Sequence, residues 1–265
     1  MNKLTVVVPV HELANDKDKN YLDEALRSLA EQSDKQFDVI LYLHKDVKYK
    51  VPSGLNLNLK RVKRDEKFSY TQAVNDAVKT EVQTDYFSVL EMDDKMHPYY
   101  IKQFHAHLNF YEDEYDLYMG LLAEVNAENQ FMGLRNESAW IVNNMNEIGV
   151  LDLETCKDKF QSLSLTGAIF NKESFLEIGG LKEKFPIFFN FEYILRALHN
   201  SHEIYVIPKV MVNHTNGREG SYFDQCANDY QLYERTEYLN FVKKEYVFEE
   251  DREIKVAENN LKIVK

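Results

Sequence analysis

The run Leu4 to Val10 (LTVVVPV) constrains the fold of this chain more than any other feature. It is apolar throughout and rich in β-branched residues, the pattern of a central parallel strand buried on both faces. A helical stripe of apolar residues lies between Tyr21 and Leu29, and Phe37 to Leu43 is a second apolar strand. Because strand–helix–strand connections are right-handed crossovers within a parallel sheet, the sequence predicts an α/β protein.

Further elements continue this alternation along the chain. Leu55 to Val62 alternates as a half-exposed third strand, Phe68 to Val78 is a helix with Ser69 as its cap, and Tyr86 to Leu90 is a fourth strand. Later strands are predicted at 116–125, 130–135, 163–170 and 204–212, and helices at 98–110, 172–178, 191–199 and 230–246. The strand at 204–212 is predicted to be an edge strand, because Pro208 interrupts it.

Composition and sequence patterns argue against several classes of protein. Only 32 basic residues stand against 44 acidic ones, a net charge of −12 that argues against a nucleic-acid-binding face. Two cysteines are too few for a disulfide framework. No apolar run is long enough for a membrane span, and the N-terminus lacks the pattern of a signal peptide. We therefore expect a cytoplasmic protein without a membrane span.

The fourth strand ends in carboxylates, at Glu91, Asp93 and Asp94. A strand projects alternate side chains to the same face, so Glu91 and Asp93 are expected to point together at its end, about 6–7 Å apart. The carboxyl ends of parallel strands are where α/β sheets bind ligands, and hard oxygens suit Mg²⁺ or Mn²⁺. The alternative is a solvated acidic turn.

Four segments, in this order, resemble a family-2 glycosyltransferase with the GT-A fold. They are Thr5 to Val10, Phe68 to Pro98, Gly167 to Leu181, and Phe189 to Arg196. The resemblance implies a GT-A-type, Rossmann-like single domain with a mostly parallel central sheet. It implies a domain over 1–221, with a nucleotide-sugar half at about 1–98 and an acceptor half at about 99–221, and a helical C-terminal extension over 222–265.

The resemblance also assigns a metal site and a donor site. Glu91 and Asp93 match the family's Asp-x-Asp metal motif, and His214 is either a third ligand to Mn²⁺ or Mg²⁺ or a structural histidine. The donor is expected to be a nucleotide-sugar, first of all a UDP-sugar, although Asp46 stands slightly beyond the family's uracil-binding Asp. The residues expected to bind substrate are Pro9, Val10, His11, Glu12, Asp46, Asn75, Gly167, Arg196 and Arg218.

The catalytic base is the largest departure from the family pattern. Inverting members place an Asp six residues before the helix Arg, and that position is Asn190 here. An amide cannot accept the proton. Glu192 is the substitute if residue 190 precedes the helix; otherwise the two positions face apart, and Glu192 is an acid favoured by the helix dipole.

The first hypothesis is thus a metal-dependent, inverting glycosyltransferase with a carbohydrate or other hydroxyl acceptor. The second is a GT-A scaffold that binds a sugar or nucleotide-sugar without turnover. A nucleotidyltransferase ranks last, because residues 11–16 are neither glycine-rich nor basic, as a phosphate loop after the first strand would be.

Overall fold

The computed structural model describes residues 3–11, 13–65, 68–110, 114–137, 149–151, 163–185, 188–221, 224, 237, 240–242 and 244–246. Its helices are α1 (Asp16–Ala30), α2 (Tyr70–Thr80), α3 (Tyr100–Phe110), α6 (Lys172–Glu177) and α7 (Phe189–His199). Its strands are β1 (Leu4–Val10), β2 (Phe37–His44), β3 (Leu59–Arg64), β4 (Tyr86–Val89), β5 (Lys95–Met96), β6 (Leu117–Val125), β7 (Phe131–Arg135), β8 (Ile169–Asn171) and β9 (Ile204–Thr215).

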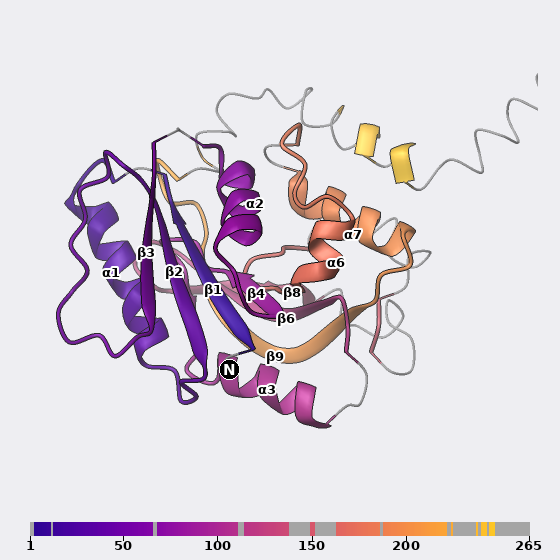
Figure 1. The fold of residues 1–265 in the computed structure, drawn as a ribbon, viewed down its shortest axis with the longest axis horizontal. Helices are drawn as coiled ribbons and strands as arrows, with labels where there is room; N and C mark the ends of the chain where they lie inside the picture. Colours follow the sequence, from indigo (N-terminus) through magenta and orange to yellow (C-terminus); the bar gives the residue numbers. More distant parts are fainter. Residues whose placement is uncertain are drawn as a thin grey trace, which may run out of the picture.

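The nine strands form one sheet in the order β3-β2-β1-β4-β8-β6-β9-β5, with β7 paired to β6. The first four strands are parallel to one another, as the opening pattern predicts (Figure 1). β8 is antiparallel to both β4 and β6, and β9 is parallel to β6. Most strands therefore run in one direction, which confirms the predicted mixed α/β architecture.

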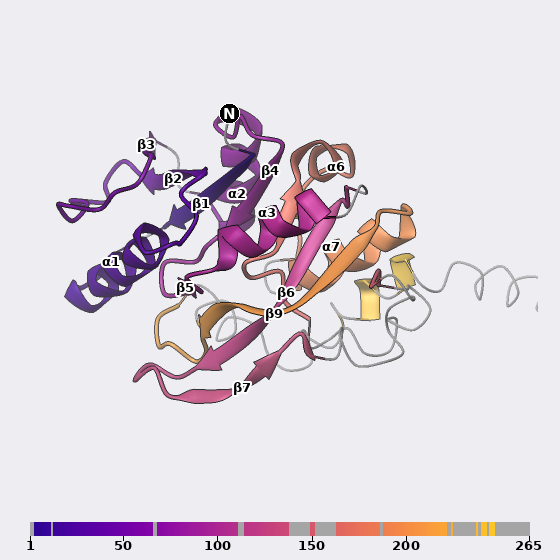
Figure 2. The same ribbon diagram turned by 90° about the horizontal axis from the view of Figure 1, so that it is seen from below.

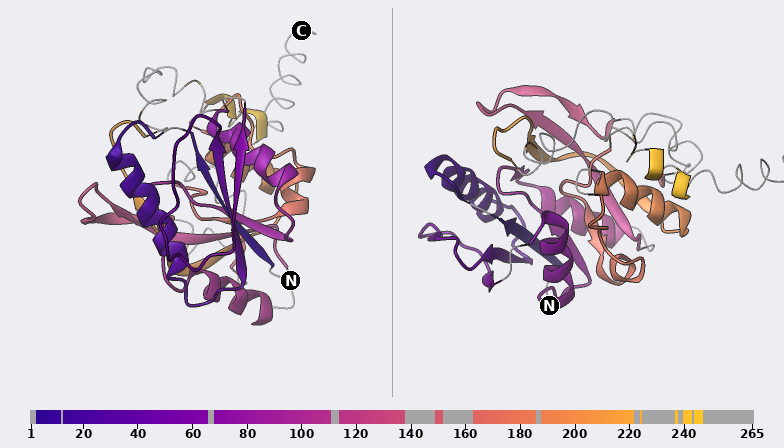
Figure 3. Two further views of the ribbon diagram at one scale, coloured as in Figure 1. Left: turned by 60° about the vertical axis from the view of Figure 1, so that its left-hand side comes forward. Right: turned by 90° about the horizontal axis from the view of Figure 1, so that it is seen from above.

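Helices cover both faces of this sheet. Alternate residues of β1 enter two separate apolar clusters: Val7 packs with α2 and α7, and Val6 packs with α1 and α3. Figure 2 shows α3 crossing one face of the sheet, and Figure 3 shows α1 and α7 at opposite ends of the molecule. β1 is buried along its whole length because both of its faces are covered, as its sequence predicts.

The α2 helix begins as its sequence predicts. Ser69 accepts a hydrogen bond from the backbone N–H of Gln72, and the Gln72 side chain accepts one from the N–H of Ser69. This capping box satisfies two N–H groups that the helix itself leaves without partners. It fixes the start of α2 beside the ends of β1 and β2, where a ligand would bind.

The prediction of an edge strand at 204–212 was wrong. β9 lies inside the sheet, between β6 and β5, and the two-residue β5 was not predicted. Pro208 is accommodated by a register shift: Gly120 pairs with Ile207, whereas the next residue, Leu121, pairs with Val210. A bulge of this kind removes the need for the N–H that proline lacks.

Other boundaries differ from prediction in length. β3 begins at Leu59 rather than at Leu55, and β8 is confined to Ile169–Asn171. Most of the predicted helix at 230–246, and of the extension at 222–265, lies outside the described residues. Within the described part of the chain, no helix has the length and apolarity that crossing a membrane requires.

Candidate donor-binding site

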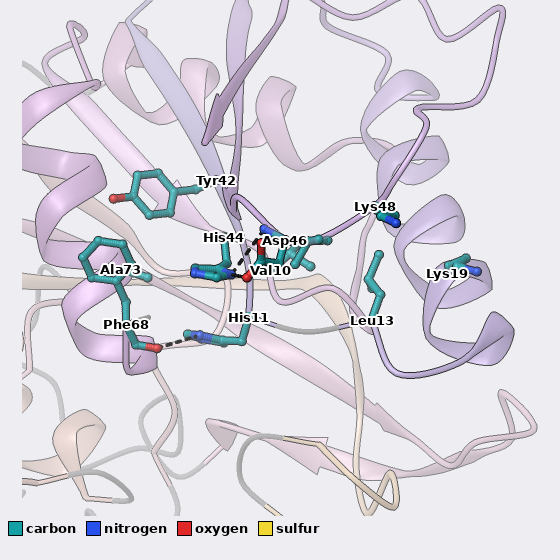
Figure 4. A pocket seen from close by; sticks show the side chains of 11 residues that line it. Val10, His11, Leu13, Lys19, Tyr42, His44, Asp46, Lys48, Phe68 and Ala73 are labelled. Atoms are coloured by element: carbon teal, nitrogen blue, oxygen red, sulfur yellow. Dashed lines mark hydrogen bonds and ion pairs between the residues drawn. The ribbon is translucent and has the colours of Figure 1, made fainter. Parts of the chain in front are cut away.

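A cavity of about 540 Å³ opens at the carboxyl ends of β1 and β2, beside the start of α2 (Figure 4). Its apolar lining consists of Val10, Leu13, Val47, Phe68 and Ala73. Its polar lining consists of His11, Lys19, Tyr42, His44, Asp46 and Lys48. This position, next to the central parallel strand, is where open α/β sheets bind their ligands. Apolar walls with a few polar groups suit a flat heteroaromatic ring with polar edges.

Hydrogen bonds hold the cavity's polar side chains in place. His11 Nδ1 lies 3.1 Å from the carbonyl oxygen of Phe68, so this nitrogen carries the hydrogen (Figure 4). Burial lowers the pKa of His11 and outweighs the opposing effect of that hydrogen bond. The imidazole is therefore neutral at pH 7. On the same wall, the Tyr42 hydroxyl donates to Asp76.

Of the predicted substrate-binding residues, Val10, His11 and Asp46 line this cavity. Pro9 is buried in β1, one residue away, where it pairs with Tyr42. Glu12 lies outside the described residues. The sequence argument missed Lys19, Tyr42, His44, Lys48, Phe68 and Ala73. Position alone could have pointed to His44, since it ends a parallel strand next to β1.

The carboxylates after β4, the strand that pairs with β1, lie close to one another, but not by strand alternation. β4 ends at Val89, and a turn follows, so the predicted alternation does not apply to Glu91 and Asp93. Glu91 as a residue is half-buried, yet its carboxyl group is enclosed beside Asp94 and Asp93. Burial and then the charges of those two neighbours raise the pKa of Glu91 to about 8.

Asp93 is paired with Arg218, which comes from the loop after β9. Arg218 Nε donates to Asp93 Oδ2 at 2.6 Å, and Arg218 Nη1 donates to Asp18 Oδ1 at 3.1 Å. The guanidinium also lies 5.5 Å from the centre of the Tyr21 ring. Arg218, predicted to bind substrate, thus joins the turn after β4 to the first turn of α1. Asp18 was not predicted, because nothing in the sequence near it indicates a partner so distant.

Asp94 anchors the end of β9. It is fully buried, and it accepts hydrogen bonds from the Thr215 backbone N–H at 2.8 Å and from His214 Nδ1 at 3.1 Å. Burial acts to lower the pKa of His214, but the charge and hydrogen bond of Asp94 outweigh it and raise that pKa to about 9. Because this pKa keeps the imidazole protonated at neutral pH, Nε2 could ligate a metal only after it loses its hydrogen. The metal role of His214 stays a prediction.

A divalent cation bound at these carboxylates would need further oxygen ligands from a bound substrate. Among the residues that the structure describes, no three His, Cys, Asp or Glu side chains come together as a self-sufficient metal site. Mg²⁺ and Mn²⁺ are often held by one or two carboxylates together with substrate phosphates. A Mn²⁺ or Mg²⁺ site at Glu91 and Asp93 therefore stays a prediction.

The prediction of Glu192 as a base is corrected by its surroundings. Both Asn190 and Glu192 lie within α7, so they face apart, and Glu192 has no exposed surface. Its carboxylate accepts from Arg196 Nε at 2.7 Å and from the Tyr246 hydroxyl at 2.7 Å, and Lys182 Nζ lies 3.3 Å away. Glu192 is part of an internal ion-pair network and has no access to a substrate.

Arg196 and Asn75 hold a turn instead of facing the cavity. Arg196 donates to the carbonyl oxygens of Ile178 and Gly180. Asn75 exchanges two hydrogen bonds with the backbone of Leu181, at 2.8 and 2.9 Å. Together they fix the Gly179–Gly180 turn after α6, so their side-chain hydrogen-bonding groups serve the fold.

Gly167 is likewise explained by packing. Its φ is +62°, in the left-handed region, and a Cβ here would collide with the side chain of Val212. Its carbonyl oxygen accepts a hydrogen bond from the Tyr100 hydroxyl at 2.9 Å. The close approach that the glycine allows is to β9, not to a ligand.

Comparison with known proteins identifies the fold and nothing finer. No protein-family model matches the sequence, and no curated protein matches it. The chain is similar to the solved structure of S. aureus TarS 1–349 in complex with UDP-GlcNAc, with a TM-score of 0.66 and 17% identity. That match covers 93% of this chain and 67% of the other.

Two further TarS structures are similar to this chain in fold. The 1–349 complex with UDP has a TM-score of 0.58 at 17% identity, over 80% of this chain and 60% of that one. For the structure described simply as TarS, the TM-score is 0.57 at 17% identity, and the match spans 80% of this chain but only 36% of TarS. The chain therefore has the GT-A, Rossmann-like fold that the sequence predicted.

Proposed function

We propose that this chain is a glycosyltransferase that moves a sugar from a nucleotide-diphospho-sugar to an acceptor hydroxyl. The observation that carries the proposal is the cavity at the carboxyl ends of β1 and β2, together with the carboxylates that follow β4, the strand that pairs with β1. A nucleoside fits the cavity, and a cation-bound diphosphate fits the carboxylates after β4. TarS, which shares the fold, was solved with UDP-GlcNAc and with UDP, which supports a UDP-sugar as the donor.

Each part of the site has a distinct task in this proposal. The base lies between the apolar walls, and the carboxylate of Asp46, which is exposed at the rim, accepts a hydrogen bond from a base N–H. Glu91 and Asp93 hold Mn²⁺ or Mg²⁺, which when bound neutralises charge on the departing diphosphate. Arg218 contributes a second positive charge. Inversion would follow from a single in-line displacement at the sugar.

The proposal also assigns the binding of donor and acceptor to different parts of the chain. Residues 1–98 bind the donor together with Arg218, and the rest of 99–221 contributes the acceptor side. The acceptor is a carbohydrate or another hydroxyl compound.

Nucleotide binding tests this function directly. Calorimetric titration with UDP, GDP, CDP and ADP, each with Mn²⁺ and with a chelator, should give tight binding for one diphosphate only when Mn²⁺ is present. A following assay measures release of that nucleotide from the matching nucleotide-sugar, with and without a panel of sugar acceptors. Failure of all four nucleotides to bind, at concentrations up to the millimolar range typical of weak substrates, would refute the proposal.

A second candidate function is binding without turnover. It is favoured by the amide at position 190 and by the enclosure of Glu192, which leave the family's base position without a carboxylate. Under this alternative, a nucleotide-sugar binds with Mn²⁺, but no acceptor accelerates release of the nucleotide. Steady release that depends on an acceptor excludes it.

A further inference from the structure

The guanidinium of Arg218 binds two carboxylates, those of Asp93 and Asp18. Arg218, Asp93 and Asp18 are only 7%, 6% and 9% exposed, so their charges are largely withdrawn from water. Asp93 belongs to the turn after β4, Asp18 to α1, and Arg218 to the loop after β9. Removing Arg218 would leave two buried carboxylates without their cation, which is costly, whereas Arg218 keeps one carboxylate partner if either Asp93 or Asp18 is removed. The bridge is therefore a strong element of this structure.

This bridge conflicts with the proposed cation site. Asp93 is one of the two carboxylates assigned to Mn²⁺ or Mg²⁺, yet Arg218 Nε already lies 2.6 Å from its Oδ2. A divalent cation bound to the same carboxylate would lie within a few ångströms of the guanidinium, and like charges at that range repel strongly outside bulk water. Repulsion between the two cations should therefore weaken the contact of Arg218 with Asp93 when a divalent cation binds that carboxylate.

Asp18 offers the guanidinium a second position. Its Oδ1 accepts from Arg218 Nη1, while its Oδ2 accepts from the Ala14 backbone N–H at 2.9 Å. The Asn15 side chain in turn accepts from the Asp18 N–H at 3.0 Å. Asp18 is thus fixed by the start of α1, independently of Asp93, and it can hold Arg218 while Asp93 is engaged elsewhere.

We propose that Arg218 is a resident counter-ion that a divalent cation displaces from Asp93, and that Asp18 is the positioning residue that retains the guanidinium beside the site. The inference rests on the proposed function, which assigns the cation to Asp93. Binding of the cation then turns Arg218 from a partner of Asp93 into a positive charge available to the donor's diphosphate. Metal and donor binding are coupled through this one side chain.

Mn²⁺ affinity in the absence of nucleotide tests the displacement. Electron paramagnetic resonance measures the Mn²⁺ that stays free in titrations of four proteins. These are wild type, Arg218→Gln, Arg218→Lys and Arg61→Gln. Because Arg218→Gln removes the competitor, it should bind Mn²⁺ about tenfold more tightly, within the range usual for coupled sites. Arg218→Lys keeps the positive charge, so its Mn²⁺ affinity should stay near that of wild type. Arg61, exposed on β3, is the matched control and should change nothing.

A double-mutant cycle tests the role of Asp18. Asp18→Asn should weaken Mn²⁺ binding in the wild-type background, because Arg218 then has Asp93 as its sole carboxylate partner among the contacts described here. In the Arg218→Gln background the same substitution should have little effect. An equal loss of Mn²⁺ affinity in both backgrounds would mean that Asp18 acts only through its own charge. That result would overturn the assignment of Asp18 as the positioning residue for Arg218.

The outcomes separate this inference from the proposed function. An unchanged or lower Mn²⁺ affinity in Arg218→Gln, or no Mn²⁺ binding by either protein, overturns the counter-ion inference. UDP titration of the same proteins reports on the function: wild type that binds UDP with Mn²⁺ supports it whatever the Arg218 result. Arg218→Gln should bind UDP less tightly despite its tighter Mn²⁺, opposite changes that a simple loss of folding cannot produce.

Discussion

His214 Nδ1 lies 3.1 Å from each carboxylate oxygen of Asp94, where the end of β9 meets the turn after β4. Although burial opposes it, Asp94 raises the pKa of this imidazole to about 9, above the value of about 6.5 for a histidine in an unfolded chain. The folded state therefore holds the proton more tightly. The resulting stabilisation is complete below pH 6.5 and is lost as the pH rises through 9.

We expect the unfolding free energy to show this dependence when divalent cations are chelated. The difference between wild type and His214→Gln should be largest near pH 6 and should shrink by up to about 3 kcal/mol between pH 6.5 and 9.5, at about 1.4 kcal/mol for each pKa unit. Urea titrations at several pH values measure it. A difference that grows with pH would contradict the assignment.

The ion pair between Glu192 and Arg196 should be structural. Glu192→Ala leaves the buried guanidinium unpaired and should lower the unfolding free energy by about 3–5 kcal/mol. Replacing both residues by Met should be much less harmful, because an apolar pair leaves no buried charge. Urea denaturation of the three proteins checks this. If Glu192→Ala proves as stable as wild type, the network does not support the fold.

Asn190 is the position at which a base can be restored. If the chain turns over a nucleotide-sugar slowly for want of a carboxylate, Asn190→Asp should raise the rate of transfer by about 10²-fold or more, the usual contribution of general base catalysis. Asn190→Ser, which adds no base, is the control. Equal rates for Asn190→Asp and wild type would show that residue 190 does not face the acceptor.

Asp46 should affect nucleotide affinity without affecting stability. Its side chain is 77% exposed at the cavity rim, so Asp46→Asn should leave the melting temperature unchanged. The loss of a charged acceptor for a base N–H should weaken binding of the preferred nucleotide by about tenfold. Asp65→Asn, at a side chain that is 86% exposed and outside the cavity lining, is the matched control.

Gly167 should tolerate no side chain. Gly167→Ala combines a left-handed φ with a collision against Val212 and should cost about 1–3 kcal/mol of unfolding free energy, or more. Gly133→Ala in β7 is the control, because a Cβ there meets nothing within 4 Å. Thermal denaturation of both variants tests the difference.

The sequence predicted the parts of the fold that local patterns determine. Leu4–Val10 is apolar because both faces of β1 are covered, and Ser69 caps α2 through groups three residues apart. Val10, His11 and Asp46 were predicted for the site from the family resemblance, and they line the cavity at the carboxyl ends of β1 and β2.

The errors share a different cause. Glu192, Arg196 and Asn75 are polar residues at positions where the family resemblance implied substrate, yet each is engaged by groups that only tertiary structure brings near. Pro208 suggested an edge strand, because a bulge opposite Gly120 cannot be read from one strand alone. The order of hydrophobic segments determines the sheet, but it does not determine the partners of buried polar groups.

Arg218 and Asp18, which meet beside the cavity, are 200 residues apart in the chain. A contact that closes so long a loop is expected to form after the intervening strands have assembled, and folds rich in long-range contacts form slowly. During synthesis, residues 10–73, which supply the cavity lining, leave the ribosome well before β9 and the loop after it. For that interval Asp93 and Asp18 have no guanidinium between them, so the charge balance of this site is among the last features of the native state to form.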